Sequence, residues 1–304
     1  MRIVVHGQQA FGKAVLERLL DEGENVVGVF CAPDKEGRPA DPLKEFALEK
    51  GLPVHQPTSW KTEEALTLMR SFDADVCMMA YVTLFVPEPV LNAPRHGTFQ
   101  YHPSLLPLHR GPSSINWPII LGETRTGLTI FWPDDGLDEG PILMQKEVAI
   151  GPDDTLGSVY FNHLFPMGVD AMIESLALVK KGEAPRIPQD HSKATYESWC
   201  GKADARIDWS KPAQDVYNLI RGCNPAPGAW TLHGDVELQF FDSRLGDAVG
   251  GEPGEVAGVD DQGMVVAAEG GSIRVQRIRA KGGKKVAAAE YAAGSGLTVG
   301  TRLG

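Results

Sequence analysis

The chain has 304 residues, of which 42% are hydrophobic and 23% charged, an ordinary composition for a water-soluble globular protein of one large or two smaller domains. Its formal net charge is −11. Residues 1–199 carry most of it, with 17 basic and 27 acidic side chains against 12 and 13 in residues 200–304. This acidity argues against nonspecific binding of nucleic acid and leaves room only for a local basic surface in the second part.

The cysteines and the hydropathy of the chain predict where in the cell the protein is located. The four cysteines, Cys31, Cys77, Cys200 and Cys223, form no CxxC pair and no zinc-finger spacing, so we expect free thiols in a reducing environment. The N-terminal sequence MRIVVHGQQAFG has one basic residue and an apolar run too short for a signal peptide. No run approaches the roughly 18 apolar residues of a membrane-spanning helix. The sequence therefore predicts a cytoplasmic protein without a membrane partner.

The first part of the chain alternates short apolar runs with helical patterns. We expect strands at residues 2–6, 26–31, 75–80, 98–102, 127–132 and 142–150. We expect helices at 13–21, at 42–51 behind an Asp41 N-cap, from Ser113 or Ser114 to 122, and from Asp154 or Thr155 to 182 with an interruption at Pro166. This alternation predicts an α/β domain over residues 1–183 with a doubly wound, mostly parallel sheet.

The pattern changes after residue 183. Residues 184–205 are rich in Pro, Ser, Lys and Asp, which is typical of a linker. A short helix is expected at 212–221, followed by closely spaced strands at 236–241, 254–259, 263–268 and 272–278. Residues 206–304 are therefore predicted to form a small β-barrel or sandwich, resembling an OB-fold.

Polar residues gather where two predicted strands end. His102 ends the strand 98–102, and because strand side chains alternate, Gln100 and His102 point to the same face. The acidic sequence PDDGLDEG, residues 133–140, follows the next strand. An imidazole, an amide and a carboxylate at the carboxyl edge of a sheet would suit acyl transfer, with the carboxylate moving protons and the others stabilising an oxyanion. Without further information the residues favour the alternative, in which His102 is a satisfied strand-end histidine and residues 133–140 form a solvated turn.

Three other motifs are weaker indications of a binding site. The sequence GQQAFG, residues 7–12, is neither GxGxxG nor a Walker loop, which argues against dinucleotide and triphosphate binding. His109 and Arg110 either contact an acidic substrate or form a polar lip on a turn. The basic stretch RIRAKGGKK, residues 277–285, is either an RNA-binding hairpin or a solvated turn.

Two motifs together resemble a known family. The sequences HPSLLPLHRG, beginning at His102, and LDEGPIL, containing Asp138, are similar to the signature of folate-dependent formyltransferases, and the two residues lie 36 positions apart. Longer stretches, including FGKAVLERLLDEG, TIFWPDDGLDEGPILMQKE and RGCNPAPGAW, resemble the N-terminal hydrolase domain of 10-formyltetrahydrofolate dehydrogenases. Methionyl-tRNA formyltransferases are more distant relatives of the same two-domain shape. The resemblance covers nearly the whole chain.

The resemblance implies a Rossmann-like formyltransferase fold and a role in one-carbon metabolism, with 10-formyltetrahydrofolate as formyl donor and no metal. It implies that His102 and Asp138 are catalytic, whereas Gln100 occupies a position where many formyltransferases have Asn. It also implies two folate-binding loops, represented by Tyr81, Val82 and Leu84 and by Asp134, Asp135 and Gly136. Oxidation of the formyl group with NADP needs a carrier and an aldehyde-dehydrogenase domain, so we expect no NAD(P) to bind these 304 residues.

The formyl acceptor stays open. Water would make the protein a hydrolase. An amine, in methionyl-tRNA, an amino sugar or another small molecule, would make it an N-formyltransferase. A non-catalytic folate-binding protein is a third alternative, which the presence of both His102 and Asp138 disfavours. The segment CAPDKEGRPADPL after residue 30 lacks the longer basic loop that the resemblance leads us to expect in tRNA enzymes.

Overall fold

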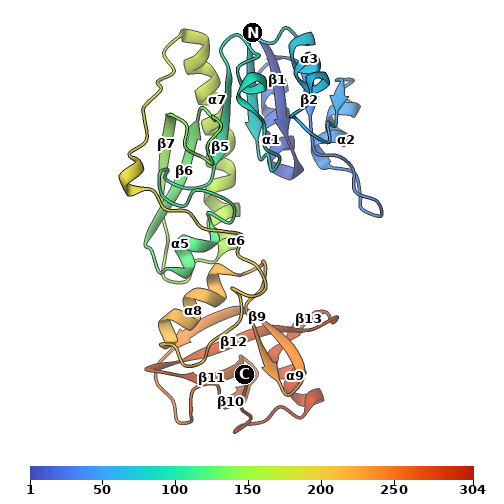
Figure 1. The fold of residues 1–304 in the computed structure, drawn as a ribbon. Helices are drawn as coiled ribbons and strands as arrows, with labels where there is room; N and C mark the ends of the chain where they lie inside the picture. The colour runs from blue at the N-terminus through green and yellow to red at the C-terminus, as the bar shows by residue number, and fades with distance from the viewer. The chain divides into compact units, whose positions relative to one another are not determined.

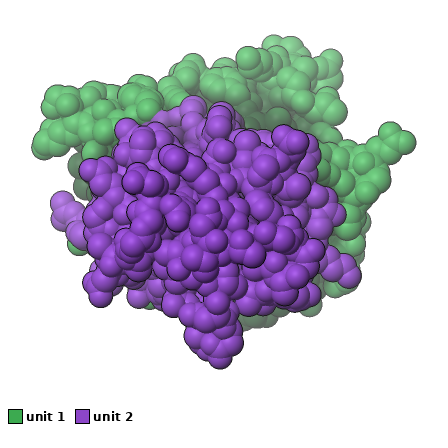
Figure 2. Space-filling view, turned by 90° about the horizontal axis from the view of Figure 1, so that it is seen from below, with its two compact units in different colours: residues 1–111, 127–148, 163–196 green, residues 112–126, 149–162, 197–304 purple.

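The computed structural model describes residues 1–304 and divides the chain into two compact units. Unit 1 comprises residues 1–111, 127–148 and 163–196, and unit 2 comprises residues 112–126, 149–162 and 197–304 (Figure 2). The segment 184–205 is shared between them, because residues up to Tyr196 belong to unit 1. No helix is long and apolar enough to cross a membrane. The cytoplasmic location stays a prediction.

Unit 1 is built on a seven-stranded sheet of order β3-β2-β1-β4-β5-β6-β7 (Figure 1). Its strands are β1 (Arg2–Gly7), β2 (Asn25–Phe30), β3 (Val54–His55), β4 (Val76–Ala80), β5 (Thr98–His102), β6 (Arg125–Phe131) and β7 (Ile142–Ala149). The first five are parallel, and β6 runs antiparallel to β5. The helices are α1 (Gln9–Asp21), α2 (Pro42–Glu49), α3 (Glu63–Ser71), α4 (Glu88–Leu91) and α7 (Phe165–Lys181). The predicted doubly wound, mostly parallel sheet is confirmed.

Alternation along β5 separates its two faces as predicted. Tyr101 stacks on Phe11 of α1, with ring centroids 4.3 Å apart, and a Cβ on Gly168 of α7 would come within 2.6 Å of the Tyr101 ring. On the opposite face, Thr98 donates a hydrogen bond from Oγ1 to the carbonyl oxygen of Leu91 at the end of α4. Helices therefore cover both faces of the sheet.

Local signals explain most helix ends. Asp41 caps α2 by accepting a hydrogen bond from the Leu43 amide, and Thr155 and Ser158 form a capping box on α6 (Leu156–Val159). A five-residue π-helical turn, Tyr160–Leu164, joins α6 to α7, so the interruption lies just before the predicted one at Pro166. The predicted serine cap of α5 (Asn116–Ile120) is wrong, because the Ser113 hydroxyl instead accepts a hydrogen bond from the Cys200 amide.

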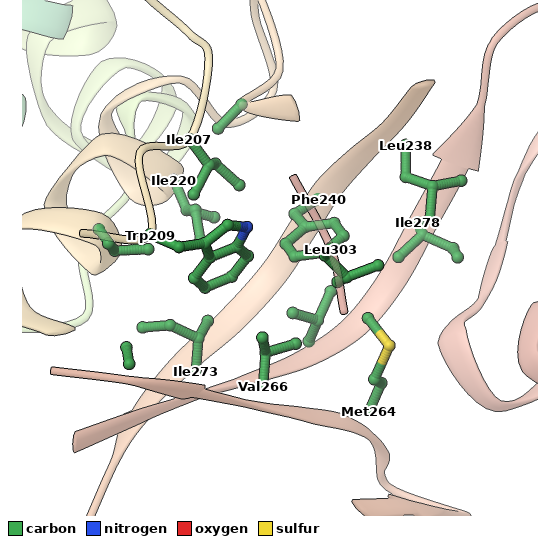
Figure 3. Close-up of a cluster of buried hydrophobic side chains, with 14 of the residues drawn as sticks. Ile207, Trp209, Ile220, Leu238, Phe240, Met264, Val266, Ile273, Ile278 and Leu303 are labelled. Atoms are coloured by element: carbon green, nitrogen blue, oxygen red, sulfur yellow. The ribbon is translucent and has the colours of Figure 1, made fainter. Parts of the chain in front are cut away.

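Unit 2 contains an antiparallel sheet, as expected for the second part of the chain. The sheet has the order β10-β11-β12-β9-β8, with β13 paired to β12. Its strands are β8 (Trp230–His233), β9 (Val236–Gly246), β10 (Val256–Asp260), β11 (Gly263–Ala268), β12 (Gly271–Ala280) and β13 (Lys285–Ala287), and its longer helices are α8 (Ala213–Gly222) and α9 (Ala288–Ser295). Apolar side chains from α8 and the strands, among them Ile220, Phe240 and Ile273, form its core (Figure 3).

Candidate active site

The carboxyl end of β5 carries a buried histidine. Only 6% of His102 is exposed, and β4 and β6 flank its strand. Its Nε2 lies 2.9 Å from the carbonyl oxygen of His109. A carbonyl oxygen can only accept, so Nε2 carries a proton. This hydrogen bond fixes the imidazole so that Nδ1 faces away from the His109 carbonyl group.

The carboxylate of Asp138 lies on the Nδ1 side of this ring. Its Oδ2 is 3.6 Å from Nδ1 of His102, and the same oxygen accepts a 2.8 Å hydrogen bond from the Gly111 amide. The Asp138 carboxylate can only accept, so it lies beside Nδ1 as a potential acceptor and as a nearby negative charge. The contact at 3.6 Å is longer than a hydrogen bond, which leaves Nδ1 of His102 available to a further partner. We call His102, Asp138 and residues 109–111 the histidine–aspartate site.

Close backbone contacts shape the loop that carries Asp138. The loop joins β6 to β7, and Asp138 adopts a left-handed conformation with φ of 55°, which is uncommon for a residue with a side chain. A Cβ on Gly140 would lie 1.8 Å from the carbonyl oxygen of Trp132, so only glycine fits at that point. The loop therefore folds back on the end of β6.

Gln100 lies two residues before His102 on the same face of β5. It is half-buried, and its side chain makes no hydrogen bond within the chain. An uncommitted amide beside His102 can donate to an oxygen of a bound molecule. The structure thus brings Gln100, His102 and Asp138 to one edge of the sheet.

The two predicted folate-binding loops meet at the start of α4. Asp135 accepts a 3.0 Å hydrogen bond from the Glu88 amide, and Asp134 accepts one of 2.9 Å from the Gly136 amide. The other loop follows β4 and begins with Tyr81, whose φ is 65°. Large apolar side chains are exposed on both loops, namely Tyr81, Leu84, Phe85 and Leu137. Exposed apolar groups beside backbone and carboxylate acceptors suit a planar, hydrogen-bonding ring system.

Sequence reasoning missed the surroundings of Arg110. Its side chain is fully buried, and its guanidinium donates to Gln189 and to the hydroxyl of Tyr196. Gln189 lies in the segment predicted to be a linker, 79 positions from its partner. Neither periodicity nor a local motif signals a contact over that separation.

Another buried histidine lies at the end of β1. Burial lowers the pKa of His6 from 6.5 to about 3, and its ring packs on Trp60 with centroids 4.7 Å apart. A surface cavity of about 780 Å³ in unit 2 is lined by residues that include Asp153, Asp242 and Arg244. None of the predicted site residues lines it. No group of three or more His, Cys, Asp or Glu side chains is arranged to hold a metal ion.

Known proteins of two kinds are similar to this chain in sequence. Cytosolic 10-formyltetrahydrofolate dehydrogenase of Xenopus laevis is 40% identical over 306 aligned positions, which cover 96% of this chain and 34% of that protein. Methionyl-tRNA formyltransferase of Trichlorobacter lovleyi is 37% identical over 307 positions, which cover 99% of this chain and 96% of that protein. The chain thus spans about a third of the length of the dehydrogenases it matches.

Solved structures share the fold. HypX from Aquifex aeolicus in complex with tetrahydrofolic acid matches 96% of this chain and 47% of its own, with a TM-score of 0.70 at 18% identity. The N-formyltransferase from Helicobacter canadensis in complex with folinic acid and dTDP-3-aminofucose matches 90% and 98%, with a TM-score of 0.70 at 17% identity. The family model for formyl transferase matches residues 1–175, and that for the formyl transferase C-terminal domain matches residues 200–296. The resemblance inferred from the two motifs is confirmed: the chain belongs to the formyl transferase family.

Proposed function

We propose that the protein transfers the formyl group of 10-formyltetrahydrofolate to water, releasing formate and tetrahydrofolate. The observation that carries the proposal is the pairing of His102 with Asp138, in which one nitrogen of the imidazole is fixed and the other faces a carboxylate. The 40% identity to a 10-formyltetrahydrofolate dehydrogenase, over nearly the whole chain, supports this donor.

In the proposed reaction Asp138 acts as the base. One of its oxygens is held by the Gly111 amide, which leaves the other to take a proton from water as the water oxygen attacks the formyl carbon. The carbonyl π electrons move to oxygen and form a tetrahedral oxyanion. In the protonated imidazole, Nδ1 of His102 donates to that charge, and an oxyanion donor of this kind contributes typically about 2.7–4 kcal/mol. The neutral amide of Gln100 is a weaker second donor.

Collapse of the intermediate completes the reaction. The C–N bond breaks, its electron pair goes to N10 of the folate, and the proton held by Asp138 is delivered to that nitrogen. N10 is an arylamine nitrogen, so it leaves more easily than an alkylamine. The other product is formic acid, which loses its remaining proton to solvent as formate, so the reaction balances without an oxidant or a reductant.

The proposed binding surface for the folate is formed by the loops containing Tyr81, Val82 and Leu84 and Asp134, Asp135 and Gly136. Their exposed apolar side chains offer contact area for a pterin ring, and their backbone groups offer hydrogen bonds. Phe85 and Leu137 extend the same apolar surface.

A second candidate is an N-formyltransferase for methionyl-tRNA. A specific observation favours it, because the alignment covers 96% of the Trichlorobacter lovleyi enzyme as well as 99% of this chain. The amine would take the place of water, and Asp138 would accept its proton. An amino-sugar acceptor follows the same chemistry.

The test is to incubate the protein with 10-formyltetrahydrofolate and follow release of tetrahydrofolate in buffer alone, with methionyl-tRNA and with a nucleotide-linked amino sugar. Turnover in buffer alone supports the hydrolase. Turnover that requires an amine assigns that amine as acceptor and overturns the hydrolase. Absence of turnover with every acceptor, with folate still bound, favours the non-catalytic alternative.

A further inference from the structure

One tripeptide contacts both proposed catalytic groups. The carbonyl oxygen of His109 accepts from Nε2 of His102, and the amide of Gly111 donates to Oδ2 of Asp138. The residue between them is Arg110, so its side chain leaves the backbone midway between the two contacts. The backbone of Arg110 thus links the two contacts covalently.

The guanidinium of Arg110 is buried in a polar network of its own. Nε and Nη2 donate to Oε1 of Gln189 at 3.2 and 2.7 Å, and Nη1 donates to the hydroxyl of Tyr196. Nη1 also lies 3.7 Å from the carboxylate of Glu139, and Nη2 lies 3.3 Å from Nδ1 of His191. A buried arginine requires such partners, because a desolvated charge without them is costly.

Gln189 extends this network to the loop that carries Asp138. Its Nε2 donates to two backbone carbonyl oxygens of that loop, those of Asp138 at 2.8 Å and Gly140 at 2.7 Å. The Gln189 amide thus accepts from Arg110 with its oxygen and donates to the loop with its nitrogen. The three residues 138–140 are held from one side by this amide and from the other by the Gly111 amide.

We propose that Arg110 and Gln189 are positioning residues that brace the loop of residues 138–140, so that the Asp138 carboxylate stays opposite Nδ1 of His102. The left-handed backbone of Asp138 supports this role, because a strained conformation persists only where its surroundings hold it. The predicted effect on turnover rests on the proposed function. The predicted effect on the geometry of His102 does not.

The alternative is that Arg110 only stabilises the fold. Gln189→Glu separates the two roles. The new carboxylate still accepts from Arg110 with an added opposite charge, but it has no N–H to donate to the carbonyls of Asp138 and Gly140. If Arg110 only stabilises the fold, Gln189→Glu keeps the wild-type turnover. If Arg110 and Gln189 brace residues 138–140, the turnover of Gln189→Glu falls.

The kinetic test compares Arg110→Ala and Gln189→Glu with Arg221→Ala. The control arginine is also buried, and it donates to backbone carbonyl oxygens of unit 2. We expect kcat to fall by about 100-fold in both brace variants with KM changed less than about threefold, since a displacement of about 1 Å at a reacting group costs on the order of 10²-fold. Added guanidinium ion is expected to restore part of kcat to Arg110→Ala and none to Gln189→Glu. Arg221→Ala should keep the wild-type kcat.

A spectroscopic test does not depend on turnover. The ring ¹⁵N signals of His102, assigned by their loss in His102→Asn, are measured in protein labelled with ¹⁵N-histidine. We expect Arg110→Ala and Gln189→Glu to move these signals in the direction that Asp138→Asn moves them. Arg221→Ala should leave them in place.

Gln189→Glu decides the proposal if Arg110→Ala does not fold. Wild-type His102 signals in folded Gln189→Glu would overturn the brace, and so would wild-type kcat in that variant. If the wild-type protein turns over no acceptor, the proposed function fails, and the His102 signals still decide whether the brace exists.

Discussion

The histidine–aspartate site of unit 1 and the core of unit 2 bury their side chains by different means. Around His102 several buried groups are polar and are held by specific hydrogen bonds, such as that from Nε2 of His102 to the His109 carbonyl oxygen. The core of unit 2 is apolar (Figure 3). An isolated hydrogen bond from Nε1 of Trp209 to the hydroxyl of Thr231 is an exception. A buried polar group depends on its particular partners, whereas an apolar core depends on filled volume. Damage to the first should therefore appear in turnover, and damage to the second in stability.

The largest effect is expected at the acid–base pair. Asp138→Asn and His102→Ala should each lower kcat by about 10³-fold, because each removes a proton-transfer group or an oxyanion donor. The double variant should lose little more than either single variant, since groups that act as a unit are not additive. The measurement is tetrahydrofolate release at saturating donor, beside thermal unfolding of each variant. Wild-type kcat in His102→Ala would refute the assignment.

The core of unit 2 should give the opposite pattern. Phe240 is fully buried, and Phe240→Ala is expected to cost about 3–5 kcal/mol of unfolding free energy through lost contacts and a cavity. Denaturant unfolding measures this loss. The kcat per folded molecule should stay within about twofold of wild type, and a fall comparable to that of Asp138→Asn would remove the distinction between the two regions.

A pH-dependent stability effect is expected from His6. Burial lowers its pKa from 6.5 to about 3. Between those two values the unfolded chain binds a proton at His6 and the folded chain does not, so unfolding free energy falls as pH drops from 6.5 toward 3. The slope is at most about 1.4 kcal/mol per pH unit. His6→Leu should remove this component from urea unfolding across that range, and the exposed His96→Gln should retain it.

The smallest effect is expected at Gln100. Its amide makes no internal hydrogen bond, so Gln100→Ala removes one neutral donor to the substrate, worth about 1 kcal/mol or roughly fivefold in kcat. Gln100→Asn tests whether the side-chain amide must extend as far as that of Gln to reach the substrate oxygen, because the Asn side chain is one methylene shorter. A loss as large as that of His102→Ala would mean that Gln100 supplies the main oxyanion contact.

The sequence predicted what short-range rules control. Alternation along residues 98–102 and the end of that strand located His102 and Gln100 on one face, and Asp41 marked the start of α2. The position of Asp138 came from motif spacing and family resemblance, because a loop of eight residues has no periodicity.

What the sequence could not show are pairings between distant segments. The Ser113 hydroxyl bonds an amide 87 positions away rather than capping α5, and Arg110 meets Gln189 in a polar stretch with the composition of a linker. Composition describes how a segment is solvated on average. It does not reveal that the side-chain amide of Gln189 is buried and makes four hydrogen bonds.

The location of Gln189 affects how segments of this family can be exchanged. The chain leaves unit 1 only after Tyr196, past the amide that holds residues 138–140. A chimaera spliced at residue 183 would take position 189 from the other parent. Where that residue is not Gln, residues 138–140 would lose two hydrogen bonds, although both sequence motifs would be unchanged. A splice after residue 196 would keep Gln189 together with residues 138–140, so its two hydrogen bonds to that loop would be retained.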